Sequence, residues 1–502
     1  MLENIVLGLT TVFQPFNLLI CAAGLFIGVL FGALPGFSAT MGVAVFIPFS
    51  YVMEPEAAML LLAGIYCGGV YGGSIPAVLI GIPGTPASVP TAMEGQALTR
   101  AGRSGEALAT VTFSSTIGGI VSAFALLIGA PLLALIAMKV GAPEQMMIAI
   151  FGLSVVCTLS FDNLLKGLLV GFISLLIATV GQDPIMGFPR FTAGFYQLTG
   201  GVDVVPILIG LFSFPQVLQM LEEHIAEKDG NKEVSRVSKM VLNLREMGKN
   251  AVNFIRSSII GVAIGIIPAA GPDIASFFAY NEARKSAKDP KKFGNGALEG
   301  IVASETANNA VTGGSLIPLL TLGIPGSAPA ALFLGAMIIH GLRPGPLLFT
   351  QNAGEVYTLL VGFIVINVMM FFVGWFYCRV SGKILLIPKP VLATTIVVLS
   401  TVGAFSINQN MWDVLMMYIA GVIGYIMVKN DFPLSPVALA LLLGKVLEQG
   451  LMQTMTLYSG KVMQIFTRPL FVIFLLLTLT SFLYPFFKNA VDKKKAAAKK
   501  ED

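Results

Sequence analysis

The stretch YGGSIPAVLIGIPGTPASVPTAME, from Tyr71 to Glu94, returns in altered form as TGGSLIPLLTLGIPGSAPAALFLG, from Thr312 to Gly335. Both copies contain Gly-Gly-Ser, a short apolar run and Gly-Ile-Pro-Gly, followed by a small hydroxyl residue, Thr85 or Ser327. When proline interrupts a helix in lipid, no water satisfies the freed backbone groups, so irregular backbone survives only where it lines a cavity or is buried in protein. Paired Gly/Pro interruptions in two halves of a chain therefore indicate the binding site of a transporter.

The composition places the chain among polytopic membrane proteins. Its 502 residues are 55% hydrophobic and only 12% charged, whereas average globular chains carry about 25% charged residues. One membrane span needs roughly 20 mostly apolar residues, and the apolar stretches predict about 12 transmembrane segments. We therefore expect an all-α polytopic membrane protein.

The sequence argues against several other classes of protein. The four cysteines are scattered without CxxC spacing, and two histidines are too few for a histidine-based metal centre. The sequence contains no GxxxxGK[ST] motif, which argues against an ATP-driven pump in this chain. Serine, histidine and cysteine candidates do not cluster along the chain, so we expect no enzyme and no catalytic residues.

The basic residues of the loops predict that the two halves are inverted repeats. Between the Gly/Pro motifs of the first half lies an acidic turn, 54–56, whereas the matching stretch of the second half, 284–292, is strongly basic. After the second motif the pattern reverses, because Arg100 and Arg103 follow it in the first half but only Arg343 in the second. Since Lys and Arg stay on the cytoplasmic side, corresponding loops face opposite sides of the membrane. A pseudo-two-fold axis in the membrane plane would then relate the halves.

The expected domain organisation follows from this division. The predicted parts are a first membrane repeat with additional helices (1–221), a polar cytoplasmic loop (222–252), a second membrane repeat with additional helices (253–487) and a basic cytoplasmic tail (488–502). Within each repeat the Gly/Pro motifs predict broken helices or helical hairpins. The spacing does not distinguish which motif forms a hairpin and which a broken helix.

The two Gly-Ile-Pro-Gly breaks are expected to meet near the membrane midplane from opposite directions. Helix N-termini attract anions, so the breaks predict a site for a carboxylate-bearing substrate. Hydroxyl side chains commonly bond back to their own helix, but their position beside the breaks, and in the related stretch GALPGFSAT (32–40), favours a role in binding. The candidate substrate-binding residues are Gly36, Ser38, Thr40, Gly84, Thr85, Ser88, Gly326 and Ser327.

Ionisable groups inside a membrane are functional candidates by default. Asp273 and Glu305 are the two that fall in the motif regions of the second half. Asp273 suits a helix N-cap as well as a cation site, and the adjacent asparagines suit either hydrogen bonding across helices or ligation. His340 is expected to be solvated. We expect a small cation, Na⁺ or H⁺, but no cofactor and no other metal, at Asp273, Glu305, Thr306, Asn308 and Asn309.

Three long runs carry a family resemblance. GALPGFSATMGVAVFIPF, YGGSIPAVLIGIPGTPASVPTAMEG and ETANNAVTGGSLIPLLTLGIPGSAPAALFLGA closely resemble the large membrane subunit of tripartite tricarboxylate transporters, the TctA family. The likeness covers nearly the whole chain. It implies a multi-pass permease of the bacterial inner (cytoplasmic) membrane that works with a small membrane subunit (TctB-like) and a periplasmic solute-binding receptor (TctC-like).

The resemblance and the motifs together predict a secondary transporter. We expect the large permease subunit of a receptor-dependent system that imports di- or tricarboxylates (citrate-like) by alternating access, coupled to Na⁺ or H⁺. The alternative is a carboxylate or anion channel, which needs a continuous pore in place of a site that is occluded from one side.

Overall fold

The structure of the chain is a computed structural model. It describes residues 2–34, 36–154, 164–183, 187–226, 237–268, 270–384 and 388–482, so the predicted tail 488–502 lies outside the described residues. The chain divides into two compact units. The first comprises Met1–Leu135 and Val205–Tyr425, and the second comprises Ile136–Val204 and Ile426–Asp502.

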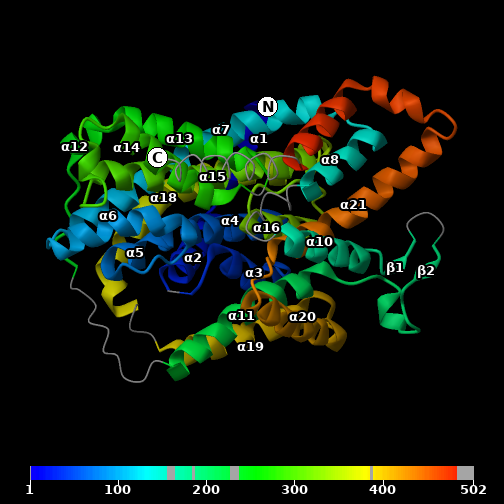
Figure 1. Cartoon of the computed structure of the whole chain (residues 1–502), viewed down its shortest axis with the longest axis horizontal. Helices are drawn as coiled ribbons and strands as arrows, with labels where there is room; N and C mark the ends of the chain where they lie inside the picture. The colour runs from blue at the N-terminus through cyan, green and yellow to red at the C-terminus, as the bar shows by residue number, and fades with distance from the viewer. Residues whose placement is uncertain are drawn as a thin grey trace, which may run out of the picture. The chain divides into compact units, whose positions relative to one another are not determined.

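Helices form nearly all of the regular structure of the described residues, as expected for an all-α membrane protein (Figure 1). Eight helices in the described part of the chain are long and apolar enough to cross a membrane, and shorter apolar helices of 10–17 residues stand beside them. The long apolar helices of the described residues thus account for eight of the about 12 predicted segments, and the shorter apolar helices are further candidates.

The first unit contains the two Gly-Ile-Pro-Gly motifs. The ends of α7, α11 and α20 extend past its boundaries. Its helices are α1 (Leu2–Val12), α2 (Pro15–Ala33), α3 (Ala39–Ser50), α4 (Pro55–Gly72), α5 (Ser74–Ile80), η1 (Pro86–Ser88), α6 (Val89–Arg100), α7 (Ser104–Ala137), α11 (Val204–Ala226), α12 (Leu244–Lys249), α13 (Ala251–Ile266), α14 (Gly271–Ser286), η4 (Pro290–Lys292), α15 (Leu298–Leu322), α16 (Ala328–Ile339), α17 (Leu348–Gln351), α18 (Ala353–Ile384), α19 (Lys389–Asn408) and α20 (Met411–Lys429).

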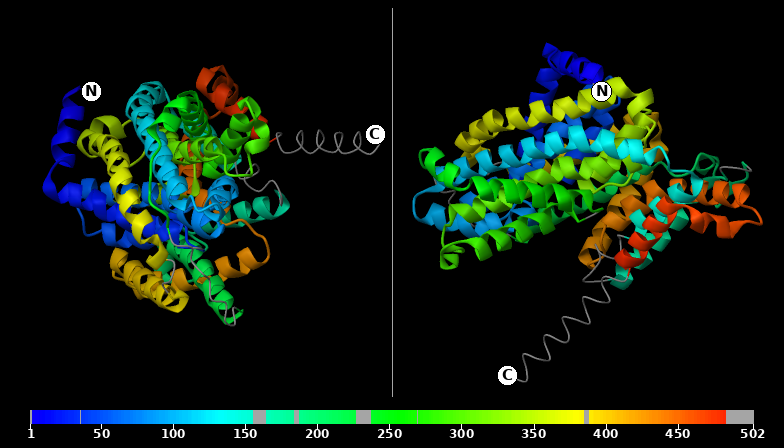
Figure 2. Two further views of the ribbon diagram at one scale, coloured as in Figure 1. Left: turned by 90° about the vertical axis from the view of Figure 1, so that its left-hand side faces the viewer. Right: turned by 90° about the horizontal axis from the view of Figure 1, so that it is seen from above.

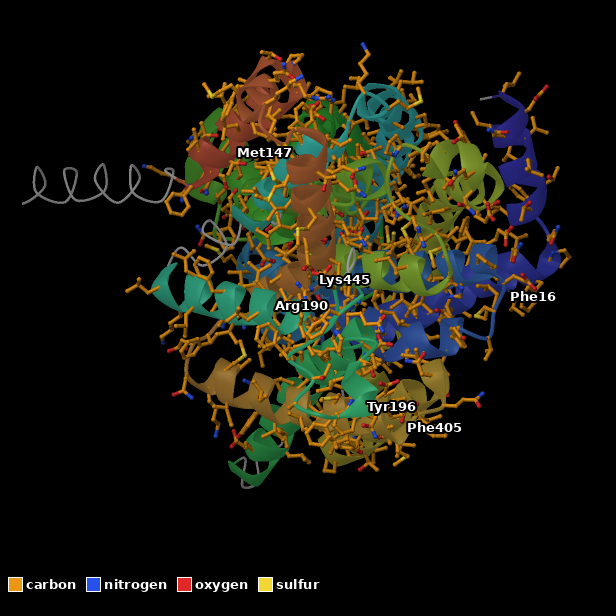
Figure 3. All side chains as sticks on the ribbon, turned by 90° about the vertical axis from the view of Figure 1, so that its right-hand side faces the viewer. Phe16, Met147, Arg190, Tyr196, Phe405 and Lys445 are labelled. Atoms are coloured by element: carbon orange, nitrogen blue, oxygen red, sulfur yellow. The ribbon has the colours of Figure 1, made fainter. Side chains whose placement is uncertain are left out.

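In the second unit α21 packs against α8 and α10. A two-residue antiparallel ladder pairs Gly181 with Arg190, which is labelled in Figure 3. The Arg190 guanidinium forms ion pairs with Asp183 at 3.3 Å and Glu448 at 2.6 Å. The elements of this unit are α8 (Ala142–Ser154), α10 (Leu164–Ala178), β1 (Gly181–Gln182), β2 (Pro189–Arg190), η3 (Tyr196–Leu198), α21 (Ser435–Leu457), η5 (Val462–Thr467) and the helix Pro469–Phe482.

Glycine contacts identify equivalent helix pairs in the first unit. On α2, a Cβ atom added to Gly32 would collide with the carbonyl oxygen of Gly69 on α4. On α13, a Cβ added to Gly265 would stand 2.9 Å from the carbonyl oxygen of Val311 on α15. Small residues let helix backbones approach closely in lipid, where packing drives association. The pairs α2–α4 and α13–α15 are therefore built in the same way.

The two central helices of these pairs, α4 and α15, pack against each other in opposite directions. The Tyr66 hydroxyl lies 2.8 Å from Ser315 Oγ, and further along α4 the carbonyl of Val70 accepts from Asn308 Nδ2 at 3.4 Å. Higher numbers on α4 thus meet lower numbers on α15. The order across the unit is α13, α15, α4, α2 (Figure 1). Antiparallel packing of equivalent helices is the arrangement that inverted repeats require.

The two units do not follow the predicted domain boundaries along the chain. The first unit combines segments from before and after the polar stretch 222–252. An inverted-repeat pair that shares one core has this property, because its halves interlock. The predicted repeat boundaries themselves stay a prediction.

Candidate functional site

Both Gly-Ile-Pro-Gly motifs are loops that join two helices. Gly81 ends α5 with φ 68° and Gly323 ends α15 with φ 72°, the left-handed conformation that glycine adopts without steric penalty. The chain then turns back, so that a Cβ on Gly84 would stand 2.5 Å from the carbonyl oxygen of Gly32. Both motifs therefore form helical hairpins. The first hairpin also has a break at Gly73, between α4 and α5.

A chain of hydroxyl groups connects the first loop to the second repeat. Thr85 Oγ1 lies 2.9 Å from Ser88 Oγ, which in turn lies 3.4 Å from Ser74 Oγ. Ser74 Oγ also lies 2.6 Å from Glu305 Oε1 as a donor. Two predicted substrate-binding residues are thus linked to a predicted cation-binding residue on α15.

Glu305 is fully buried, with an exposed fraction of 0%. Ser74 and Thr91 both donate to its Oε1 atom, and Ser115 donates to Oε2 at 3.1 Å. No Lys or Arg of the described residues forms an ion pair with it. A buried carboxylate without a basic partner is costly as a bare anion. A bound cation or a proton would stabilise this position.

The asparagines next to Glu305 are also buried. Asn308 Nδ2 donates to the carbonyl of Val70 at 3.4 Å, and Asn309 Nδ2 donates to the carbonyl of Glu305 at 3.1 Å. The Oδ1 atoms of both asparagines lie buried with no hydrogen-bond partner among the described residues. Buried polar atoms are normally hydrogen bonded, so these oxygens mark positions for an ion or water. Thr306, in contrast, donates to the carbonyl of Ser114 on α7 at 3.4 Å.

Asp273 lies in the first turn of α14 and is not its N-cap. The N-cap residue is Ala270, which makes no side-chain cap bond, so the expected capping role was wrong. The Asp273 carboxylate faces the backbone N–H of Ala87 in η1. Its side chain is accessible at the surface, whereas Glu305 is buried. The structure therefore brings both predicted acidic residues to the neighbourhood of η1.

The second loop carries hydroxyl groups in place of carboxylates. Ser327 is the N-cap of α16, where its Oγ accepts from the N–H of Ala330 at 3.4 Å. The Tyr66 hydroxyl lies 2.8 Å from Ser327 Oγ and 2.8 Å from Ser315 Oγ. Sequence reasoning missed Tyr66, because an aromatic residue in an apolar helix normally belongs to the core. Ser315 had a signal, since it is the serine of the second Gly-Gly-Ser.

Within the described residues, no hydrogen bond joins Gly36, Ser38 or Thr40 to either loop. Gly36 is exposed, with φ 87°. Ser38 caps α3 by accepting from the N–H of Met41 at 3.2 Å, and it accepts from Gln216 Nε2 at 3.4 Å. Thr40 is half-buried in the first turn of α3. Gly36 and Ser38 face Met220 and Gln216 of α11, and the role of all three residues in substrate binding stays a prediction.

Glu94 fastens one end of the repeats together, and sequence reasoning did not single it out. This fully buried carboxylate on α6 accepts from the Tyr280 hydroxyl at 2.7 Å and from the backbone N–H groups of Gly294, Gly296 and Ala297 at 2.6, 2.8 and 2.7 Å. It thereby holds α6 of the first repeat to the segment between α14 and α15.

His340 makes the equivalent contact from the other repeat, between α16 and α3. Its Nε2 atom lies 3.1 Å from Ser50 Oγ. The Ser50 hydroxyl already donates to the carbonyl of Ile47 at 2.6 Å, so the histidine nitrogen is the donor. Burial lowers the pKa of His340 below its ordinary value of 6.5. His340 is half-buried, so the histidine that we expected to be solvated is only partly exposed.

Comparison with known proteins supports a transporter. The sequence model of the tripartite tricarboxylate transporter TctA family matches residues 18–439. An uncharacterised 52.8 kDa protein in the TAR-I ttuC' 3' region of Agrobacterium vitis is 35% identical over 470 residues, which cover 94% of this chain and 93% of that protein. An uncharacterised protein in the TAR-II ttuC' 3' region of Agrobacterium vitis is 33% identical over 210 residues, 42% of this chain and 87% of that protein. No solved structure matches the chain. The chain belongs to the tripartite tricarboxylate transporter TctA family.

Proposed function

We propose that this multi-pass membrane protein is the large permease subunit of a receptor-dependent secondary transporter. It imports a citrate-like di- or tricarboxylate across the bacterial inner membrane by alternating access, coupled to Na⁺ or H⁺. Its partners are a small membrane subunit (TctB-like) and a periplasmic solute-binding receptor (TctC-like). Membership in a transporter family supports this function and speaks against an enzyme.

The observation that carries the proposal is the buried carboxylate of Glu305, which has no basic partner within the described part of the chain. A carboxylate-bearing substrate near this anion is repelled unless a cation arrives with it. Binding of the cation therefore favours binding of the substrate. Such mutual dependence is the physical basis of coupled transport.

The two loops supply different chemistry for the two solutes. At the second loop, the hydroxyls of Tyr66, Ser315 and Ser327 lie at the N-terminus of α16. Hydroxyl donors and a helix N-terminus suit a carboxylate. At the first loop, the carboxylate of Glu305 and the unpaired Oδ1 of Asn308 suit a cation. We assign the substrate to the second loop and the coupling ion to the first.

Alternating access requires contacts that close the two ends of the site in turn. Glu94 joins α6 to the segment after α14, and His340 joins α16 to α3. In inverted repeats, equivalent contacts lie toward opposite faces of the membrane. The Glu94 contact adjoins the basic stretch 284–292, which the charge distribution assigns to the cytoplasm. We assign the Glu94 contact to the cytoplasmic gate and the His340 contact to the periplasmic gate.

Uptake of labelled citrate into proteoliposomes tests this function. The chain is reconstituted with its small membrane subunit and its receptor, and uptake is measured with and without a Na⁺ or H⁺ gradient. We expect saturable uptake that needs both the receptor and a cation gradient. Flux that does not saturate and needs neither would identify an anion channel.

A further inference from the structure

Asn367 on α18 is fully buried, with an exposed fraction of 0%. Its Nδ2 donates to the carbonyl of Phe363 at 2.7 Å, which fixes the orientation of the amide because a carbonyl only accepts. Its Oδ1 has no hydrogen-bond partner among the described residues. This oxygen faces Gly119 of α7, where an added Cβ would collide with it. Asn367 thus presents an unused acceptor to α7.

Asn309 on α15 lies beside the part of α7 that contains Gly119. Thr306, one turn earlier on α15, donates to a carbonyl of α7. Gly313, one turn later, lies so close to α7 that an added Cβ would collide with the carbonyl oxygen of Ser122. Asn309 lies between them on the same face of α15. Its Oδ1 is also buried and lacks a hydrogen-bond partner in the described part of the chain.

Cys67 of α4 contacts Asn367 and a residue one helical turn from Asn309. Asn367 Nδ2 lies 3.9 Å from Cys67 Sγ, and the same thiol interacts with the side chain of Thr312, one turn after Asn309. Figure 2 shows α7 and α18 running alongside each other, as the contact between Gly119 and Asn367 requires. Two unpaired amide oxygens from α15 and α18 therefore reach one buried junction of α4, α7, α15 and α18.

This junction is distinct from the surroundings of Glu305. The side chain of Asn308 reaches Val70 on α4 and the carboxylate of Glu305. Neighbouring residues on a helix point about 100° apart. Asn308 and Asn309 therefore serve different places, although they are adjacent in sequence.

We infer that the junction is a second cation site, in which the Oδ1 atoms of Asn309 and Asn367 ligate a monovalent cation of the Na⁺ class. Amide oxygens are ligands for hard cations. Neither asparagine carries a charge, and burial of a divalent ion without a carboxylate is costly. The binding of Na⁺ at this site does not depend on the proposed function. A role of the site in cation-coupled transport does.

Binding of ²²Na⁺ to the purified full-length chain tests the site. We expect Asn367→Ala and Asn309→Ala each to lose one Na⁺ ion per chain at saturation, because each removes a ligand of the same site. The double variant should lose no more than either single variant. Asn253→Ala is the matched control, since this buried asparagine on α13 already donates to the carbonyl of Glu299 at 3.0 Å. It should keep the full number of bound ions.

A second variant keeps the test decisive if removal of a buried amide prevents folding. Asn367→Asp retains an oxygen at the site and adds a charge, so it should bind Na⁺ several-fold more tightly than the unmodified chain. Gly119→Ala, which places a methyl group against Asn367 Oδ1, should abolish this binding. An unchanged number of bound ions in folded Asn309→Ala and Asn367→Ala, or unchanged affinity in Asn367→Asp, overturns the inference. If the unmodified chain binds ²²Na⁺ as expected but does not take up citrate, the result counts against the proposed function and not against this site.

Discussion

Tyr66 and Asn308 occupy matching places on α4 and α15 but meet different surroundings. Each lies about two helical turns before the residue against which the glycine of its own loop packs, which is Gly73 just after α4 and Ser315 on α15. The Tyr66 hydroxyl is bonded to the second loop, with its oxygen 2.8 Å from Ser327 Oγ. The Oδ1 atom of Asn308 has no such partner among the described residues. The two loops of the inverted pair therefore differ in chemistry.

Replacement of Tyr66 by Phe should weaken substrate binding and leave the cation dependence unchanged. The variant removes the hydroxyl that lies between Ser315 and Ser327. Loss of one hydrogen bond to a charged group, about 1.5 kcal/mol, raises KM for citrate roughly tenfold. Tyr71→Phe is the control, because this buried hydroxyl on the same helix contacts Thr112 at 2.8 Å, away from the loop. Equal KM values for the two variants would contradict the assignment of the substrate to the second loop.

Replacement of either loop glycine by alanine should destabilise the protein. A Cβ on Gly84 would stand 2.5 Å from the carbonyl oxygen of Gly32, and one on Gly326 would collide with that of Gly265. Overpacking against fixed backbone costs about 1–3 kcal/mol. Gly335→Ala on α16 is the control, since its nearest neighbour would be a side-chain carbon at 3.7 Å. The melting temperatures of the variants in detergent measure the loss of stability. A decrease in Gly335→Ala alone would contradict the packing of the two loop glycines.

The breaks at both motifs could be predicted because glycine and proline impose backbone geometry locally, but that both motifs form hairpins could not. Gly81 and Gly323 adopt the left-handed conformation that glycine accepts without steric penalty. Aligning the two Gly-Gly-Ser triplets matches Ser74 with Ser315, but the loop glycines pack on Gly73 and Ser315. The second copy has one more residue between Gly-Gly-Ser and Gly-Ile-Pro-Gly. The sequence motif therefore misplaces the equivalent positions by one residue.

The rest of the site depends on contacts between distant segments. Ser38 has a clear local signal for a helix cap, and it does cap α3, but nothing nearby in sequence indicates that Gln216 of α11 is its neighbour. Glu94 follows a Gly/Pro-rich stretch and resembles a solvated loop residue. Its burial arises from four donors that come from the other repeat. Tertiary packing decides such cases.

Glu94→Gln should destabilise the chain by about 2–3 kcal/mol, because an amide N–H would face backbone donors and leave them unsatisfied. The two oxygens of Glu94 accept four hydrogen bonds, three of them from backbone N–H groups. Denaturation in detergent measures the loss. Glu299→Gln, at an exposed position of α15, should change little. Equal stability of the two variants would argue against a fastening role for Glu94.

His340 should make the stability of the protein sensitive to acid. Burial lowers its pKa below 6.5, so the unfolded chain binds this proton more readily than the folded one. The stabilisation is present above pH 6.5 and is lost as the pH falls below that value. Melting temperatures at about pH 7.5 and about pH 5.5 should differ more for the unmodified chain than for His340→Gln. An identical decrease in both proteins would exclude His340 as the cause.

Glu305→Gln tests the central claim most directly. The substitution keeps the size of the side chain and removes the buried negative charge for which a coupling ion is needed. Citrate uptake by reconstituted proteoliposomes, with receptor and small subunit present, is measured over a range of Na⁺ concentrations and pH values. We predict that Glu305→Gln abolishes the dependence of uptake on the coupling cation. Uptake with the cation dependence of the unmodified protein would contradict the assignment of the coupling ion to Glu305.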